Sequence, residues 1–292
     1  MATKVPDNFL GIEKLWSDYK KSKVVIASAP YEGTVTYGKG ASKAPRAIIE
    51  ASKQVEFYDE EIKLNVLEKI GGIATLNGYK LPKNPEGVAE ILEKETKKQI
   101  EQKKFTVTLG GEHSVAIGPA RAYSKSFKDT SILYFDAHGD LREEYDGSRY
   151  NHACALKRIS DVNQNIVHVG ARSVCEEEVE LIQKKGWKFF WAHEFKRNPV
   201  DYGEIIENLK DNVYISFDID VVDSALMPAT GTPEPGGLDW YDLTTVVRKV
   251  AKERNVLGFD LCELSPRKDF PAYDFMAAKL IYKTIGYSLL KI

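Results

Sequence analysis

The chain has 292 residues with 41 basic and 43 acidic side chains, a formal net charge of -2, and a composition that is 43% hydrophobic and 29% charged. These values are typical of a globular protein, and they exclude a disordered chain, a fibrous repeat and a strongly basic nucleic-acid-binding protein. A chain of this length can bury a large core, and no linker or repeat interrupts it, so we expect one domain over residues 1–292.

The apolar segments are short throughout. The N-terminal region lacks the long apolar segment of a signal peptide, and no stretch approaches the ~20 apolar residues that cross a membrane. Cys154, Cys175 and Cys262 are widely spaced without a CxxC pair, which predicts buried thiols rather than a disulfide framework or a thiolate zinc site. We therefore expect a cytoplasmic protein with no membrane or nucleic-acid partner.

Short apolar runs rich in β-forming residues recur along the chain and predict strands. They cover residues 23–27, 105–109, 131–135, 166–170, 213–217 and 256–259. Helical spacing lies between several of them and is clearest at Val88–Lys104, where Val88, Ile91 and Leu92 begin an apolar stripe. Strands that are apolar on both faces and alternate with helices indicate a mostly parallel sheet covered on both sides. This pattern predicts an α/β fold.

The first motif along the chain, GTVTYGKG at 33–40, follows a predicted strand and differs by one residue from a phosphate-binding P-loop. Gly40 stands where that loop needs Ser or Thr to bind magnesium. Pro45 also delays the next helix beyond the place where its N-terminus would hold phosphate. We do not expect nucleotide hydrolysis.

Polar motifs follow four of the predicted strands. GGEHS follows the run 105–109, DAHGD the run 131–135, DIDVVD the run 213–217, and DLCE the run 256–259. In parallel sheets, ligands bind beyond the carboxyl ends of the strands, where these loops gather. We therefore expect the acidic and imidazole groups to lie together at one edge of the sheet.

The residue types in these motifs predict a site for two divalent cations. Four clustered carboxylates would repel one another unless a cation compensates them, and two histidines add neutral nitrogen donors; the candidates are His113, Asp136, His138, Asp140, Asp218 and Asp220. This oxygen-rich set without a thiolate suits manganese better than structural zinc, although ligand type alone does not fix the metal. Two cations that share carboxylates can deprotonate a water at neutral pH, which indicates a hydrolase. His168 and His193 have no such neighbours, and we interpret them as structural or surface residues.

Taken together, these motifs resemble the ureohydrolase family of arginases, agmatinases and related guanidino hydrolases, and they look most like agmatinases. The matching segments are 30–48 (PYEGTVTYGKGASKAPRAI), 110–114, 136–140, 216–223 (SFDIDVVD), 231–237 (GTPEPGG) and 273–280. The resemblance covers nearly the whole chain. It implies a three-layer α/β/α fold with a mostly parallel central sheet, two Mn²⁺ ions per subunit, and a homo-oligomer, commonly a trimer or a hexamer.

The resemblance also implies roles for individual residues. The first Mn²⁺ would be held by His113, Asp136, Asp140 and Asp218, and the second by Asp136, His138, Asp218 and Asp220. Asp140 would also accept a hydrogen bond from the attacking hydroxide and carry its proton to the leaving nitrogen. His152 matches the family's proton-shuttling histidine, and Glu263 matches the carboxylate that orients the guanidinium. The expected products are urea and an amine.

The chain departs from the family pattern at two places. Ser224 follows Asp223 where the family usually has Pro, and Arg142 replaces an Asn that helps arginases to hold the α-groups of arginine. The arginase-type clamp is therefore not evident. Acidic residues beside the site could favour the cationic tail of agmatine, namely Glu143, Glu144 or Asp146. The sequence thus predicts an agmatinase that forms putrescine in polyamine synthesis.

Other activities stay open. Arg142 could instead pair with a substrate carboxylate, as in an arginase or a guanidinobutyrase. A metal-binding homologue without turnover is disfavoured, because all six ligand positions, His152 and Glu263 are intact. A zinc amidohydrolase of related α/β/α architecture, acting on acyl-lysine or acyl-polyamine, would not need this many carboxylates.

Overall fold

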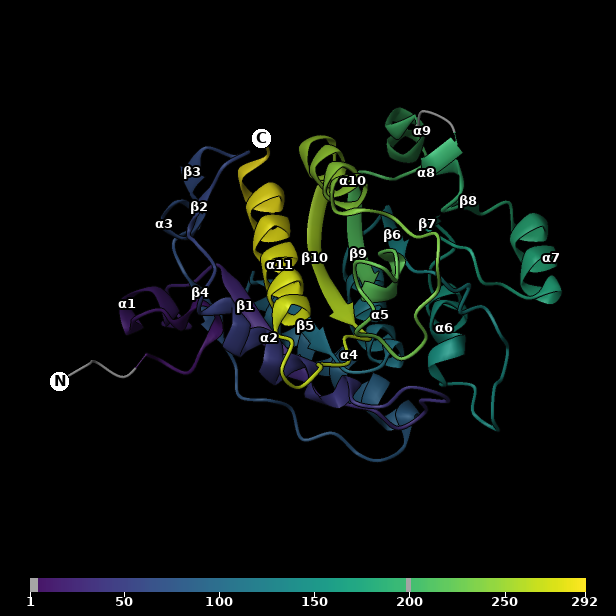
Figure 1. Ribbon diagram of the computed structural model, residues 1–292, viewed down its shortest axis with the longest axis horizontal. Coiled ribbons are helices and arrows are strands. Elements are labelled where there is room, and N and C mark those ends of the chain that lie inside the picture. Colours follow the sequence, from purple (N-terminus) through teal and green to yellow (C-terminus); the bar gives the residue numbers. More distant parts are fainter. Residues whose placement is uncertain (1–4, 198–200) are drawn as a thin grey trace.

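Eight parallel strands form the central sheet of the computed structural model, which describes residues 5–197 and 201–292 (Figure 1). Residues 1–4 and 198–200 of the expected domain lie outside the described residues. The strands are β1 (Val24–Ala29), β4 (Ile73–Thr75), β5 (Phe105–Gly110), β6 (Thr130–Phe135), β7 (Ile166–Val169), β8 (Lys188–Phe190), β9 (Asn212–Asp218) and β10 (Asn255–Cys262). Their order across the sheet is β4-β1-β5-β10-β9-β6-β7-β8. A separate antiparallel pair joins β2 (Tyr58–Asp59) to β3 (Leu64–Asn65).

Helices cover both faces of this sheet. They are α1 (Lys14–Ser17), α2 (Ala44–Ser52), α3 (Val66–Ile70), α4 (Pro85–Glu101), α5 (Ile117–Ser126), α6 (Ala155–Ser160), α7 (Glu176–Lys185), α8 (Glu194–Arg197), α9 (Tyr202–Glu207), α10 (Trp240–Glu253) and α11 (Ala272–Leu290). On one face α11 packs between α2 and α10, and on the other α5 packs between α4 and α6 (Figure 1). The three-layer α/β/α fold expected from the sequence is confirmed.

Burial on both faces explains why the sequence predicted the inner strands well. Every residue of β1, β5 and β6 is buried, so these strands appear in the sequence as continuous apolar runs. The sequence missed the short strands β2 and β3, of two residues each, and two strands of the central sheet, β4 and β8, which have three residues each and form its two edges. Helix α4 begins three residues before the predicted start, because Pro85 occupies its first turn, where a missing N–H costs nothing.

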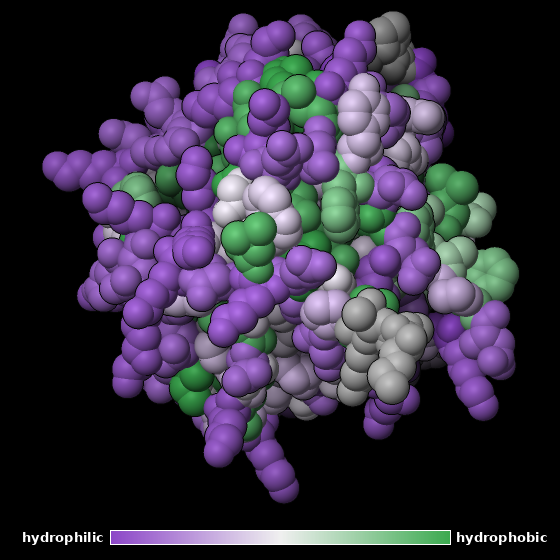
Figure 2. Space-filling view, turned by 90° about the vertical axis from the view of Figure 1, so that its left-hand side faces the viewer, coloured by the Kyte–Doolittle hydropathy of each residue, from purple (hydrophilic) through white to green (hydrophobic). Residues whose placement is uncertain are grey.

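The face of the molecule shown in Figure 2 is mainly polar. Figure 2 shows the face that includes the left-hand side of Figure 1, where hydrophilic residues surround separate hydrophobic patches. In the part of the chain that the structure describes, no helix is both long enough and apolar enough for a transmembrane span. The large apolar side chains are mostly buried between the sheet and its helices.

Candidate metal centre

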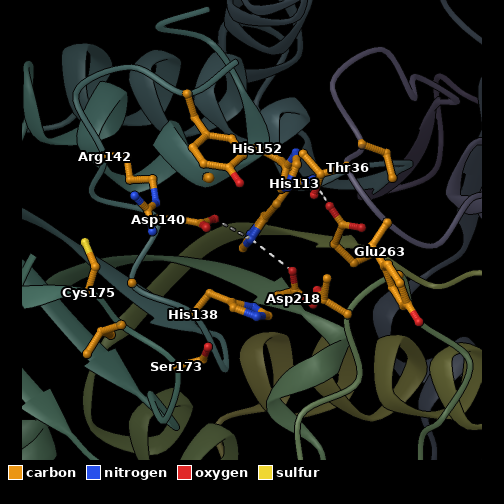
Figure 3. Close-up of a pocket in the computed structure, with 18 of the residues that line it drawn as sticks. Thr36, His113, His138, Asp140, Arg142, His152, Ser173, Cys175, Asp218 and Glu263 are labelled. Atoms are coloured by element: carbon orange, nitrogen blue, oxygen red, sulfur yellow. Dashed lines mark hydrogen bonds and ion pairs between the residues drawn. The ribbon is translucent and has the colours of Figure 1, made fainter.

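The four motifs meet because the four strands that carry them are neighbours. Strands β5, β10, β9 and β6 lie side by side in the middle of the sheet, and each ends at the same edge. A pocket of about 260 Å³ opens there, and its walls include His113, His138, Asp140, His152, Asp218 and Glu263 (Figure 3). The predicted gathering of acidic and imidazole groups at one edge is confirmed.

One group of candidate ligands surrounds His113, which follows β5. Its Nδ1 lies 3.0 Å from Oδ2 of Asp136 and 3.4 Å from Oδ2 of both Asp140 and Asp218. All four side chains are buried. His113, Asp136 and Asp140 each offer one ligand atom, and these atoms lie within 4.8 Å of one another, close enough to share a metal ion.

A second group lies beside the first and shares Asp136 with it. It joins Asp136, His138 and Asp220, and Nδ1 of His138 lies 2.9 Å from Oδ2 of Asp220. Asp218 is held close to both groups, because its Oδ1 accepts a hydrogen bond of 2.8 Å from the backbone N–H of Asp220. The arrangement therefore brings together all six of the ligands expected from the sequence.

Two residues at this edge adopt backbone angles that L-amino acids rarely use. Asp140 has φ of 50° and Glu263 has φ of 67°, both in the left-handed region. The N–H of Glu263 donates to the carbonyl of Gly111, and its side chain accepts from the N–H of His113 at 2.6 Å. Such strain is maintained only where the surroundings hold it, and it is common at functional sites.

The electrostatics of the cluster show how poorly the chain alone balances these charges. Burial and then the charge of Asp140 raise the pKa of Asp136 to about 6, while burial and the charge of Asp220 raise the pKa of Asp218 well above its usual range. Burial lowers the pKa of His113, but hydrogen bonds to the surrounding carboxylates outweigh this effect and raise it well above its ordinary value. Mutual repulsion and burial thus favour a bound cation.

The donor set fits divalent metal ions. Oδ2 of Asp220 is buried and accepts no hydrogen bond from the described residues, although His138 Nδ1 is near it. A buried carboxylate oxygen without a donor carries a large desolvation penalty, which a cation would remove. The two groups that share Asp136 offer carboxylate and imidazole ligands, which suit a divalent ion, and a third candidate group joins His113 to Asp260 and Cys262.

Several supporting residues had no signature in the sequence. Nε2 of His113 lies 2.9 Å from the hydroxyl of Ser216, which donates to buried Asp260 at 2.9 Å. Nδ1 of His113 is thereby left for a metal, since Nε2 carries the proton. On the other side of the ring, the hydroxyl of Tyr134 donates to Oδ2 of Asp140 at 2.8 Å.

His168 is structural, as expected, but it supports the site directly. Its Nε2 lies 2.8 Å from the carbonyl oxygen of His138, and burial lowers the pKa of His168 to about 3. A neutral ring can donate here only through a protonated Nε2, so His168 fixes the backbone of a candidate ligand. His193 is exposed and lies outside the pocket, as the sequence suggested.

Loops form the other walls of the pocket. Residues 35–38, within the P-loop-like segment, line it together with Tyr145, Gly231 and Thr232. Thr36 lies beside Glu263, while Arg142 and Cys175 lie beyond Asp140 (Figure 3). Cys154 and Cys262 are buried thiols as expected, whereas Cys175 is partly exposed because it precedes α7 at the pocket wall.

The acidic residues suggested to favour agmatine lie outside the lining of the pocket. Glu143, Glu144 and Asp146 do not line the pocket, and Arg142 does. Glu143 instead pairs with three cations on the outer side of the loop, Arg149, Lys157 and Arg158, and these contacts lower its pKa to about 2 despite the opposing effect of burial. The sequence could not reveal this, because the direction of each loop side chain depends on partners elsewhere in the fold.

Comparisons with known proteins agree with this geometry. A model of the arginase family matches residues 22–286. The chain is 35% identical over 292 aligned residues to the N(1)-aminopropylagmatine ureohydrolase of Synechocystis sp., covering 98% of this chain and 95% of that protein. It is 33% identical to the agmatinase of Pyrococcus horikoshii, covering 93% and 94% of the two chains. The crystal structure of the agmatine ureohydrolase of Thermoplasma volcanium superposes with a TM-score of 0.87 at 32% identity, covering 97% and 94%.

Proposed function

The chain belongs to the arginase family and is a hydrolase of the agmatinase-like ureohydrolase type, and from this premise we propose that it binds two Mn²⁺ ions and converts agmatine to putrescine and urea. One observation carries the proposal: the six candidate metal ligands lie together at the carboxyl edge of the sheet, and four of them line one pocket with Glu263, namely His113, His138, Asp140 and Asp218. That pocket has room for a small guanidino compound.

The candidate ligands divide between two ions. His113, Asp136, Asp140 and Asp218 would hold one, and Asp136, His138, Asp218 and Asp220 would hold the other. When bound, the two ions supply a hydroxide nucleophile at neutral pH and stabilise the negative charge that develops during hydrolysis. Ser216 and His168 orient the two histidines for this task through hydrogen bonds.

Three residues act on the substrate and its protons. Glu263 orients the guanidinium by charge-assisted hydrogen bonds, and burial together with the charge of Glu112 raises the pKa of Glu263 to about 8 in the free pocket. A bound guanidinium favours its carboxylate form. Asp140 accepts the proton of the nucleophile and passes it to the leaving nitrogen, and His152 exchanges protons with bulk water.

Arg142 favours a second candidate substrate class. Its guanidinium carbon lies 5.1 Å from the centre of the Tyr145 ring. Arg142 and Glu263 border opposite ends of the pocket, with the candidate ligands between them (Figure 3). A cation there would attract the carboxylate of a guanidino acid, such as 4-guanidinobutyrate or arginine, and repel an amine. The agmatinase and aminopropylagmatine ureohydrolase names of the relatives support agmatine and its aminopropyl derivative instead.

Urea release measured in parallel tests the proposal. Agmatine, N(1)-aminopropylagmatine, arginine and 4-guanidinobutyrate are supplied to the manganese-loaded protein, and agmatine should give the highest kcat/KM. Turnover of arginine that is about tenfold faster than that of agmatine would contradict the choice of agmatine. Such a difference corresponds to about 1.4 kcal/mol of preference for the arginine transition state. Arg142→Met tests whether Arg142 contacts the tail of the substrate, and it should slow the hydrolysis of the guanidino acids only. Elemental analysis of the unmodified protein should find two manganese ions per chain.

We further propose that residues 1–292 form one domain and that the chain assembles into a homo-oligomer of three or six copies, as the family resemblance implies. Sedimentation equilibrium measures the assembled mass, and a mass equal to that of one chain would contradict the assembly.

A further inference from the structure

A buried carboxylate beside the metal centre has no role in the reaction described so far. Glu112 is fully buried and pairs with no lysine or arginine among the described residues. Three donors converge on it: the backbone N–H of Thr34 at 2.7 Å, the hydroxyl of Thr34 at 2.6 Å and the hydroxyl of Ser114 at 2.5 Å. In all three bonds the carboxylate of Glu112 is the acceptor.

The same threonine also contacts His152. Its Oγ1 accepts a hydrogen bond of 3.0 Å from the backbone N–H of His152, and Nδ1 of the ring lies 3.3 Å from this oxygen. The neighbouring side chain of Asn151 donates to the carbonyl of Thr34 at 3.4 Å. Two segments that are 118 residues apart in the sequence are therefore tied together at the pocket wall.

The number of protons available determines which group donates in the hydrogen bonds that join Glu112, Thr34 and His152. A threonine hydroxyl has one proton, and at Thr34 that proton points to the carboxylate of Glu112, which can only accept. The oxygen of Thr34 must therefore accept from His152. Nδ1 then carries the ring proton, and Nε2 keeps a free lone pair. His152 borders the pocket beside Asp140 (Figure 3).

We infer that Thr34, anchored by Glu112, is a positioning residue that holds His152 in the Nδ1–H tautomer with Nε2 free to exchange protons at the pocket. The inference rests on the proposed function, in which His152 carries protons between the site and water. Nothing in the family model or in the names of the relatives assigns a role to Thr34. The positioning requires the hydroxyl, because a methyl group in its place can neither donate to Glu112 nor accept from His152.

Thr34→Val removes the hydroxyl with little change of shape, and Thr34→Ser keeps it. Thr34→Val should lower kcat for urea release by roughly tenfold or more, since a positioned proton-transfer group contributes about 100- to 10,000-fold. KM and manganese content should stay unchanged, and Thr34→Ser should recover most of the kcat. Thr75→Val is the matched control, because the Thr75 hydroxyl also accepts a backbone N–H, at 2.9 Å from Phe9, but lies outside the pocket.

A double-mutant cycle separates positioning from a general loss of structure. In a His152→Asn background, Thr34→Val should cause no further loss of kcat, because the group it positions is absent. An equal loss in both backgrounds, or full kcat in Thr34→Val, would overturn the inference. If the unmodified enzyme releases no urea from any of the four guanidino substrates, the proposed function fails instead.

The tautomer provides a readout that does not depend on activity. Nitrogen NMR of the histidine ring should show the proton of His152 on Nδ1 in the unmodified protein and a mixture of tautomers in Thr34→Val. A ring protonated on Nε2 in the unmodified protein would overturn the inference whatever the activity.

Discussion

Two clusters in this protein contain buried carboxylates but balance their negative charge differently. One is the metal-ligand cluster at the carboxyl edge of the sheet. The other, beside α11, is formed by Asp59, Glu60, Glu61 and Lys283. In the second cluster, Nζ of buried Lys283 lies 2.8 Å from Asp59, 3.0 Å from Glu60 and 3.5 Å from Glu61. In the metal-ligand cluster, the carboxylates pair with histidines, and no lysine or arginine among the described residues forms an ion pair with them.

This difference affects the direction of the pKa shifts. Burial raises the pKa of Asp59, but the hydrogen bond and charge of Lys283, together with the backbone N–H groups of Ile62 and Glu61, outweigh this effect, so that the pKa is lowered. At Asp136 and Asp218 burial and repulsion prevail, and the pKa of each is raised. The second cluster thus balances its buried carboxylate with a lysine, whereas in the metal-ligand cluster His113 and His138 lower the pKa values of Asp140 and Asp220 but leave those of Asp136 and Asp218 raised, which favours a cation from outside.

The largest effect should come from breaking the cluster that needs an external cation. Asp136→Ala removes a carboxylate that both proposed ions share with Asp218. Metal content should fall, and urea release should drop by roughly a thousandfold or more, because metal ions supply several kcal/mol of transition-state stabilisation. Asp146→Ala is the control, since Asp146 is exposed and outside the pocket. Unchanged metal content in Asp136→Ala would contradict the assignment.

Lys283→Met tests the self-balanced cluster and should affect stability rather than activity. It leaves the fully buried carboxylate of Asp59 without its cation, which costs about 3–5 kcal/mol when a buried pair loses one partner. Denaturant unfolding of the metal-loaded protein measures the loss, and kcat should be unchanged.

A second variant keeps this test specific to charge. Lys283→Met combined with Asp59→Asn should be more stable than Lys283→Met alone, because the amide oxygen can still accept the backbone N–H groups of Glu61 and Ile62. Equal stability of the single and double variants would show that lost packing, not an uncompensated charge, causes the effect.

The two clusters also differ in how far the sequence could predict them. The ligands were predictable because each directly follows an apolar strand, so that a local pattern and one rule about parallel sheets bring them together. Lys283 and Asp59 are 224 residues apart, and neither lies in a motif. Their pairing depends on how α11 packs against the β2-β3 hairpin region.

The same limit applies within the site. Asp140, His138 and Asp220 belong to recognisable motifs, whereas Thr34 and Ser216 act through single hydroxyl groups, which are common in any sequence. Glu143 pairs with Lys157 and Arg158, which follow in a later helix, whereas Arg142 lines the pocket. Sequence patterns therefore identify the ligands but not the groups that orient them.

The smallest expected effect is the pH dependence of the free energy of unfolding of the metal-free protein. It also compares the two clusters most directly. Between about pH 4.5 and 8, Glu263 keeps its proton in the native state, where its pKa is raised to about 8 by burial and by Glu112, but loses it in the unfolded chain. The unfolded state then binds fewer protons, so the free energy of unfolding falls as pH rises. Asp136 acts in the same direction up to about pH 6, and Asp59 acts oppositely, since its lowered pKa gives stability that is lost in acid.

Thermal unfolding in the presence of EDTA should therefore show a Tm that falls from pH 6 to pH 8, and Glu263→Gln should make that fall shallower. Part of the fall in Tm with pH should remain in this variant, because the raised pKa values of His113 and His138 keep these rings protonated in the native state over this pH range. Glu144→Gln, a change at an exposed carboxylate outside the pocket, should leave the slope as it is. A Tm that rises over this range would mean that the chain balances the carboxylates of the metal-ligand cluster by itself, as it does at Asp59, and the contrast between the two clusters would be lost.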